Sequence, residues 1–253
     1  MSAVIQSTSS DAAAERAIRI DLAAAYRLVA LYGWDDLIFT HISARIPGPQ
    51  HHFLINPYGM MFEEITASSL VKIGLDGHPI GEARYPVNPA GFTIHSAVHE
   101  VRADAGCVIH LHTPDGTAIA TCAEGLQPLN QTAQLAIGDL AYHDYEGVAL
   151  DHAERPRLQA DLGAHNLMLL RNHGTLTVGR TCAEAFTRMY FLERACTMQV
   201  RTRACGGDYP TAEAVIEKNI ALSRAQGMTD VANKLVWPAL LRKLDRIDPS
   251  YKD

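Results

Sequence analysis

The chain has 253 residues, enough for one large α/β domain or two small ones with a sizeable core. Its composition, with 47% hydrophobic and 20% charged residues, is that of a globular protein, and a formal net charge of -6 argues against nucleic acid or an anionic membrane as a partner. No apolar run reaches membrane-spanning length, and residues 1–10 lack the pattern of a secretory signal. The five cysteines form no Cys-x-x-Cys pair, so we expect no disulfide framework or zinc knuckle, and a reducing cytoplasm.

The first part of the chain predicts a long helix followed by short strands. An alanine-rich amphipathic run predicts a helix from Asp11 to Tyr32, ended by Gly33. Strands are expected over Leu37–Ile46 and His52–Ile55. Residues 66–73 fit either a helical turn or the start of another strand.

The middle of the chain alternates helices and apolar strands. We expect a helix over Ala90–Glu100, an apolar strand at Cys107–Thr113, and a helix that Asp115 caps and that runs through Ala123. Residues 133–141 are ambiguous between helix and strand.

The last part predicts further helices around one buried strand. Arg155–Leu162 is expected to be helical and Leu167–Arg171 to be a short buried strand. Thr181 and Glu184 have the spacing of a capping box, which would open an amphipathic helix to about Ala204. The tail is interpreted as a weak helix plus polar residues.

Strands interleaved with helices indicate an α/β layered sandwich, although the periodicity does not decide whether its sheet is parallel or mixed. No internal repeat or low-complexity linker divides the chain. We therefore predict a flexible leader over 1–15, one domain over 16–207, and a C-terminal helical extension over 208–253. The extension is expected to pack on the same domain or on a neighbouring subunit.

Two histidines in the apolar strand are the most informative feature of the chain. His110 and His112 are separated by one residue, so on a strand both project from the same face and can bind a single metal ion. A third histidine, His173, follows the buried strand at Leu167–Arg171. Three imidazole ligands would leave one or two coordination positions open, as a Lewis-acid catalyst requires.

Several motifs around these histidines resemble the class II aldolase/adducin family, and within it the adducin head domain and its stand-alone bacterial relatives. They are His110-Leu111-His112-Thr113-Pro114, Gly138-Asp139-Leu140-Ala141-Tyr142 and Arg171-Asn172-His173-Gly174, together with similar segments at 37–45, 65–72 and 88–97. The resemblance covers roughly Ala23 to Gly207 in the expected order and spacing, and does not extend to the tail.

The resemblance implies a three-layer α/β/α fold around a mixed, largely antiparallel sheet. It also implies a tetramer with the active site at a subunit boundary, and a small-molecule substrate. The family's three metal-binding histidines match His110, His112 and His173. The metal is usually zinc, with manganese or iron in some relatives, and it holds the hydroxyketone of a sugar phosphate during aldol cleavage.

The chain departs from the sugar-phosphate aldolases at three places. The position of their acid/base glutamate falls at Gly91, and their phosphate-binding serine pair becomes Pro89-Ala90. Their N-terminal Gly-Asn is here Thr40-His41, and their proton-donating tyrosine would fall near Gln131. We therefore do not expect sugar-phosphate aldolase activity by the usual mechanism.

Other polar residues are candidates for the site. His41 is a candidate catalytic base, since imidazole titrates near neutral pH, although a histidine bonded to its own loop is an equal alternative. Arg45 is a candidate for binding a substrate carboxylate. Asn56 and Gly59 lie in a tight turn that the family places near the pocket, and are candidates for substrate binding.

Three functional hypotheses follow. The first is a metal-dependent lyase that cleaves or decarboxylates a small non-phosphorylated oxo or hydroxy acid. The second is a non-catalytic, adducin-like module whose function is its assembly. The third is a non-haem iron oxygenase on the same fold. Metal content, activity after metal addition and oxygen uptake with Fe(II) distinguish the three.

Overall fold

The computed structural model describes residues 9–253 except 75, 83, 150 and 227–228. The described chain forms a seven-stranded sheet with the strand order β3-β2-β1-β4-β7-β6-β5. The strands are β1 (His41–Arg45), β2 (Phe53–Ile55), β3 (Val71–Ile73), β4 (Cys107–Leu111), β5 (Leu140–His143), β6 (Leu167–Leu170) and β7 (Gly174–Gly179). Only β5 and β6 pair in parallel; the other neighbouring strands are antiparallel. The α/β fold with a mixed, largely antiparallel sheet is therefore confirmed.

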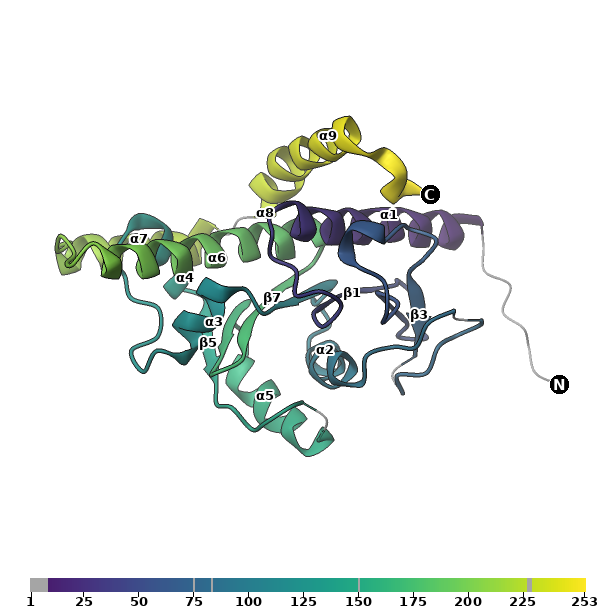
Figure 1. Ribbon diagram of the computed structural model, residues 1–253, viewed down its shortest axis with the longest axis horizontal. Helices are drawn as coiled ribbons and strands as arrows, with labels where there is room; N and C mark the ends of the chain where they lie inside the picture. The colour runs from purple at the N-terminus through teal and green to yellow at the C-terminus, as the bar shows by residue number, and fades with distance from the viewer. Residues whose placement is uncertain (1–8, 75, 83, 150, 227–228) are drawn as a thin grey trace.

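Helices cover both faces of this sheet (Figure 1). They are α1 (Ser9–Leu31), α2 (Pro89–Val101), α3 (Pro114–Thr121), α4 (Gln131–Ile137), α5 (Arg155–Leu162), α6 (Cys182–Ala204), α7 (Glu213–Gln226), α8 (Thr229–Val231) and α9 (Trp237–Ile247). Short helical segments are η1 (Phe62–Glu64), η2 (His152–Glu154), η3 (Ala232–Val236) and η4 (Pro249–Lys252). None of the described helices is long and apolar enough to cross a bilayer.

Alternation along β4 distributes its side chains between the two helical layers. Ile109 and Leu111 belong to the hydrophobic core that includes residues of α1 and α6. Val108 belongs to a second core, with residues of α2 and α5. His110 therefore projects toward the layer of α2 and α5, because side chains two apart on a strand share a face.

Two strand predictions are corrected. The strand expected from Leu37 begins only at His41, because Leu37 has a left-handed backbone (φ 51°) and Phe39 N–H bonds to Asp36 O in a turn. The central strand β7 was not predicted at all. Its sequence, Gly-Thr-Leu-Thr-Val-Gly, lacks a continuous apolar run, and its two threonines are buried through hydrogen bonds of their hydroxyl groups.

Helix caps also differ in part from the sequence prediction. Thr113, and not Asp115, caps α3 by accepting from Gly116 N, because the chain turns into the helix directly after the metal-site strand. The Asp115 carboxylate instead accepts from Thr197 Oγ1 at 2.6 Å. The predicted cap of α6 is confirmed, since Thr181 Oγ1 accepts from Glu184 N at 3.2 Å.

The tail contains more helix than predicted. Helix α7 packs on α4, where Asn219 Nδ2 donates to Gln134 Oε1 at 2.7 Å. Helix α9 lies on α1, and Trp237 Nε1 donates to Asp21 Oδ1 at 2.9 Å (Figure 1). The apolar side chains of α9 are spaced so that they form one face, which the short scattered runs of the tail did not reveal in the sequence. The division into leader, domain and extension stays a prediction.

Candidate metal centre

The pairing of β4 with β7 brings the three predicted histidines together. His110 lies on β4, and His112 follows the end of that strand. His173 lies in the β6–β7 turn, where Asn172 has a left-handed backbone (φ 55°). Leu111 pairs with Thr175, so the turn sits beside the end of β4. One ring nitrogen from each of the three histidines lies within 4.8 Å of the other two.

Hydrogen bonds fix which nitrogen of two rings faces the centre. His110 Nδ1 lies 3.0 Å from the carbonyl oxygen of Thr175, and His112 Nδ1 lies 3.1 Å from Asp36 Oδ2. Because both oxygens accept, both Nδ1 atoms donate, and a neutral ring then keeps a lone pair on Nε2. The two Nε2 atoms lie 2.9 Å apart. Facing lone pairs at this distance repel unless a cation or proton lies between them, so the donor set fits a divalent metal ion.

Burial favours the neutral, ligating form of the rings. It lowers the pKa of His110 well below its usual value and the pKa of His173 to about 4. Neighbouring imidazoles contribute to both of these shifts in pKa, after burial. Neutral imidazole is the form that binds a metal ion.

A buried carboxyl group supports the metal-binding segments from behind, and the sequence analysis missed it. Glu193 of α6 accepts from the hydroxyl of Thr113, which follows His112, and from Thr175 Oγ1 at 2.7 Å. Burial raises the pKa of Glu193 to about 7. The sequence signal that could have revealed Glu193 was a glutamate on the apolar face of a predicted helix, between Met189 and Cys196.

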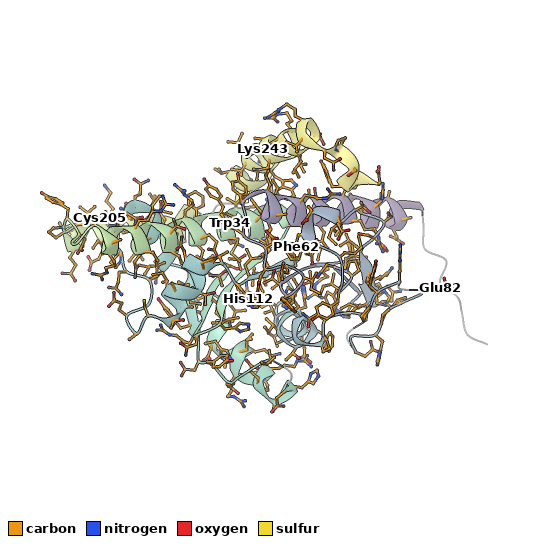
Figure 2. The ribbon with its side chains drawn as sticks, viewed as in Figure 1. Trp34, Phe62, Glu82, His112, Cys205 and Lys243 are labelled. Atoms are coloured by element: carbon orange, nitrogen blue, oxygen red, sulfur yellow. The ribbon has the colours of Figure 1, made fainter. Side chains whose placement is uncertain are left out.

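The histidines open into a cleft of about 550 Å³. Figure 2 places His112 near the middle of the molecule. The wall of the cleft also includes Phe39, Tyr58 and Ile94, and Asp36 is its one acidic side chain among the described residues. None of the described residues that line it is lysine or arginine.

A larger hollow of about 690 Å³ lies beside α1, and its lining does not include His110, His112 or His173. Two of its cations, Arg19 and Lys72, are each paired with Glu15 at 2.8 Å. We therefore assign the chemistry to the smaller cleft, where the metal-ligating groups converge.

Phenols line the cleft, although none stands at Gln131, the position at which the family's aldolases have their tyrosine. Gln131 opens α4 and does not line the cleft, whereas Tyr145 does. The ring centroids of Tyr145 and His173 are 6.4 Å apart. Because β5 runs parallel to β6, the loop after β5 reaches the same end of the sheet as His173. His143, at the end of β5, anchors this loop through Asp161 at 2.7 Å.

His41 lies beside the metal ligands and lines the cleft. It pairs across the sheet with His110, and the centroids of the two rings are 5.1 Å apart. A Cβ atom at Gly91 would lie 2.6 Å from His41 Cδ2. The His41 ring therefore occupies the space that a side chain at position 91 would need, which explains why this chain has glycine there.

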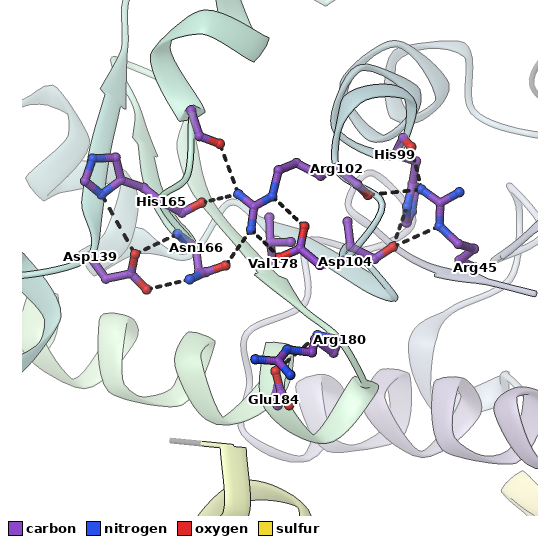
Figure 3. Close-up of polar contacts among 12 residues, drawn as sticks. Arg45, His99, Arg102, Asp104, Asp139, His165, Asn166, Val178, Arg180 and Glu184 are labelled. Atoms are coloured by element: carbon purple, nitrogen blue, oxygen red, sulfur yellow. Dashed lines mark hydrogen bonds and ion pairs between the residues drawn. The ribbon is translucent and has the colours of Figure 1, made fainter. Parts of the chain in front are cut away.

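The structure does not bring Arg45, Asn56 or Gly59 into the cleft. Arg45 lies at the other end of β1, where its guanidinium donates to the carbonyls of Ala105 and Arg102, both at 3.2 Å, and of His99 (Figure 3). Asn56 Oδ1 accepts from the hydroxyl of a buried tyrosine at 2.8 Å. Gly59 has φ 131°, and a Cβ atom there would lie 3.1 Å from Cδ1 of Tyr85. Between Asn56 and Gly59, only Tyr58 reaches the cleft wall.

The family model of the class II aldolase and adducin N-terminal domain matches residues 20–200. The chain belongs to this family. A Caulobacter vibrioides protein, named provisionally as a class 2 aldolase, is 56% identical over 245 residues, which are 95% of this chain and 93% of that protein. Mouse alpha-adducin is 46% identical over 196 residues, which are 76% of this chain but 26% of alpha-adducin.

Solved structures agree with this assignment. An aldolase II superfamily protein from Pseudomonas syringae superimposes with a TM-score of 0.91 at 42% identity, covering 98% of each chain. L-fuculose 1-phosphate aldolase from Glaciozyma antarctica superimposes with a TM-score of 0.81 at 25% identity, covering 98% of this chain and 96% of that one.

Weakening the ligand orientation should weaken metal binding. We expect Asp36→Asn to lower zinc affinity by about 10- to 100-fold, because the His112 ring loses its carboxylate partner. His112→Ala should remove most of the bound zinc. The measurement is a zinc titration of metal-free protein, with the exposed His78→Ala as the control. Equal zinc affinity in all four proteins would contradict the assignment of these ligands.

Glu193 should make stability depend on pH. Its pKa of about 7 exceeds the ordinary value of 4.5, so the native state binds more protons. The stabilisation of the folded state by protonated Glu193 is therefore complete below about pH 4.5. As the pH rises through 7, up to about 3 kcal/mol of the free energy of unfolding is lost. We expect Glu193→Gln to reduce the fall in the free energy of unfolding between pH 5 and pH 8.

Urea denaturation of metal-free protein measures this difference. The matched control is Glu217→Gln, which changes an exposed glutamate. If the pH profiles of wild type and Glu193→Gln run in parallel, the buried carboxyl group does not titrate as stated.

Proposed function

We propose that this protein is a metal-dependent carbon–carbon lyase acting on a small non-phosphorylated oxo or hydroxy acid, by aldol cleavage or decarboxylation. Membership of the family implies metal-dependent aldolase-type chemistry. The observation that best supports an active centre is that the Nδ1 hydrogens of His110 and His112 are committed to protein oxygens while their Nε2 atoms face each other. This is the arrangement expected of hydrogen bonds that orient metal-binding histidines.

His110, His112 and His173 would hold the ion, and we propose zinc, with manganese and iron as alternatives, because imidazole suits all of these metals to different degrees. When bound, the cation supplies positive charge to the substrate oxygen on which negative charge develops. The apolar side chains of Phe39 and Ile94 would exclude water from the reacting atoms.

Two further groups would move protons. His41 lines the cleft beside His110 and would accept a proton from the substrate through a ring nitrogen. Tyr145 lines the same cleft beside His173, and its hydroxyl would return a proton to the product. This pair would replace the glutamate that the family's aldolases have at the position of Gly91.

The described cleft wall has no cationic side chain, which supports a substrate without phosphate. Proteins bind phosphate chiefly through arginine, lysine or exposed backbone N–H groups. No lysine or arginine is found among the described residues of the cleft wall.

The test is turnover of a panel of oxo and hydroxy acids by metal-free protein to which zinc, manganese or ferrous ion is added. We expect turnover only with metal and little with L-fuculose 1-phosphate. Tyr145→Phe should lower kcat by about 10²- to 10⁴-fold with metal content unchanged. The control is Tyr209→Phe, a tyrosine that is 92% exposed. A fully loaded protein that converts no acid in the panel would contradict the proposal.

A second candidate is a non-catalytic, adducin-like module that acts by assembling with copies of itself. The 46% identity to alpha-adducin favours it, and so do the exposed apolar side chains of Leu37 and Val148 near the cleft, 57% and 71% exposed. In either case we propose a cytoplasmic homotetramer. Light scattering gives the number of subunits, and a tetramer that binds no metal would favour the module over the lyase.

A further inference from the structure

Four buried polar side chains connect the cleft to the far end of β1. Measured between polar atoms, His41 Nδ1 lies 2.8 Å from His95 Nε2, and His95 Nδ1 lies 2.5 Å from Ser43 Oγ. Ser43 Oγ also lies 2.7 Å from His99 Nε2, and His99 Nδ1 lies 3.1 Å from Ala105 O. No member of the chain is more than 3% exposed.

The sequence periods of a strand and a helix create this chain. His41 and Ser43 are two apart on β1 and therefore share a face. His95 and His99 are four apart on α2, one turn of the helix, and face β1. Side chains from the two elements consequently alternate along the contact, without a gap.

The carbonyl oxygen of Ala105, the last acceptor of this hydrogen-bonded series, determines the direction of every hydrogen bond in it. A carbonyl oxygen only accepts, so His99 Nδ1 donates. Burial, and to a smaller extent the nearby guanidinium of Arg45, lowers the pKa of His99 to about 3. The ring is therefore neutral, its Nε2 is a bare acceptor, and Ser43 must donate to it.

The same reasoning continues to the cleft. A hydroxyl has one hydrogen, which Ser43 gives to His99, so Ser43 Oγ accepts from His95 Nδ1. Burial lowers the pKa of His95 well below its usual value, which leaves a bare Nε2 on that ring as well. His41 Nδ1 must then be the donor to His95.

We propose that His95, Ser43 and His99 are positioning residues that fix the tautomer of His41, so that its Nδ1 carries the hydrogen and its Nε2 presents a lone pair to the cleft. The inference deepens the proposed function, in which His41 accepts a proton from the substrate. The opposite tautomer would present an N–H group, which can donate but cannot accept.

Arg45 has a role in this arrangement although it lies outside the cleft. Its Nε donates to the same Ala105 carbonyl at 3.2 Å, and its guanidinium donates to the backbone of His99 (Figure 3). These bonds hold in place the Ala105 carbonyl, which is the last acceptor of the hydrogen-bonded series. If every hydrogen bond ran in the opposite direction, the lone pair of His99 Nδ1 would face that carbonyl oxygen, which is repulsive.

Neutron diffraction from deuterated, zinc-loaded crystals tests the proposal directly. We expect deuterons on Nδ1 of His41, His95 and His99, and none on Nε2 of these rings. A deuteron on Nε2 of His41 would overturn the proposal. Because the readout needs no turnover, its result is independent of whether the protein is a lyase.

Variants show whether the chain sets the tautomer. Ser43→Ala removes the link between His95 and His99, and should place a deuteron partly or wholly on Nε2 of His41, with zinc content unchanged. The matched control is Ser96→Ala, which removes a buried hydroxyl of α2 that donates to Thr93 O. If His41 has the same tautomer in Ser43→Ala as in the wild type, the chain does not set it. Should Ser43→Ala not fold, the wild-type deuteron positions decide alone.

Discussion

The antiparallel pairing of β4 with β7 is the contact on which the rest of the centre depends. It sets the end of one strand, with His110 and His112, beside the turn that holds His173. The backbone hydrogen bonds of two central strands are among the most protected in a fold. His110 therefore sits on a rigid strand, and His112 and His173 lie next to the ends of such strands, while a longer loop supplies Tyr145.

Buried polar groups on both sides of the sheet then set the orientation of the imidazoles. On one side, Glu193 joins Thr113 to Thr175, and the carbonyl of Thr175 orients His110. On the other side, His95 orients His41. Burying such groups is costly unless each has a partner, so these networks also specify one arrangement of the site.

Local patterns predicted the parts of the site that depend on short-range geometry. The strand period of two was sufficient to place His110 and His112 on one face, and the capping residue Thr181 was evident from its spacing to Glu184. Features that depend on pairing between distant segments were missed. The strand β7 has too few apolar residues to be recognised without its neighbours, and Tyr145 reaches the cleft only because β5 joins the sheet in parallel.

The exchange of a carboxylate for an imidazole beside the metal ligands changes the charge balance of the centre. With glycine at position 91 and a neutral ring at His41, the described wall of the cleft has only Asp36 as a formal anion. A divalent cation held by three neutral imidazoles would keep most of its charge uncompensated. The centre would thus attract small anions electrostatically, so an organic acid would need no arginine to bind there.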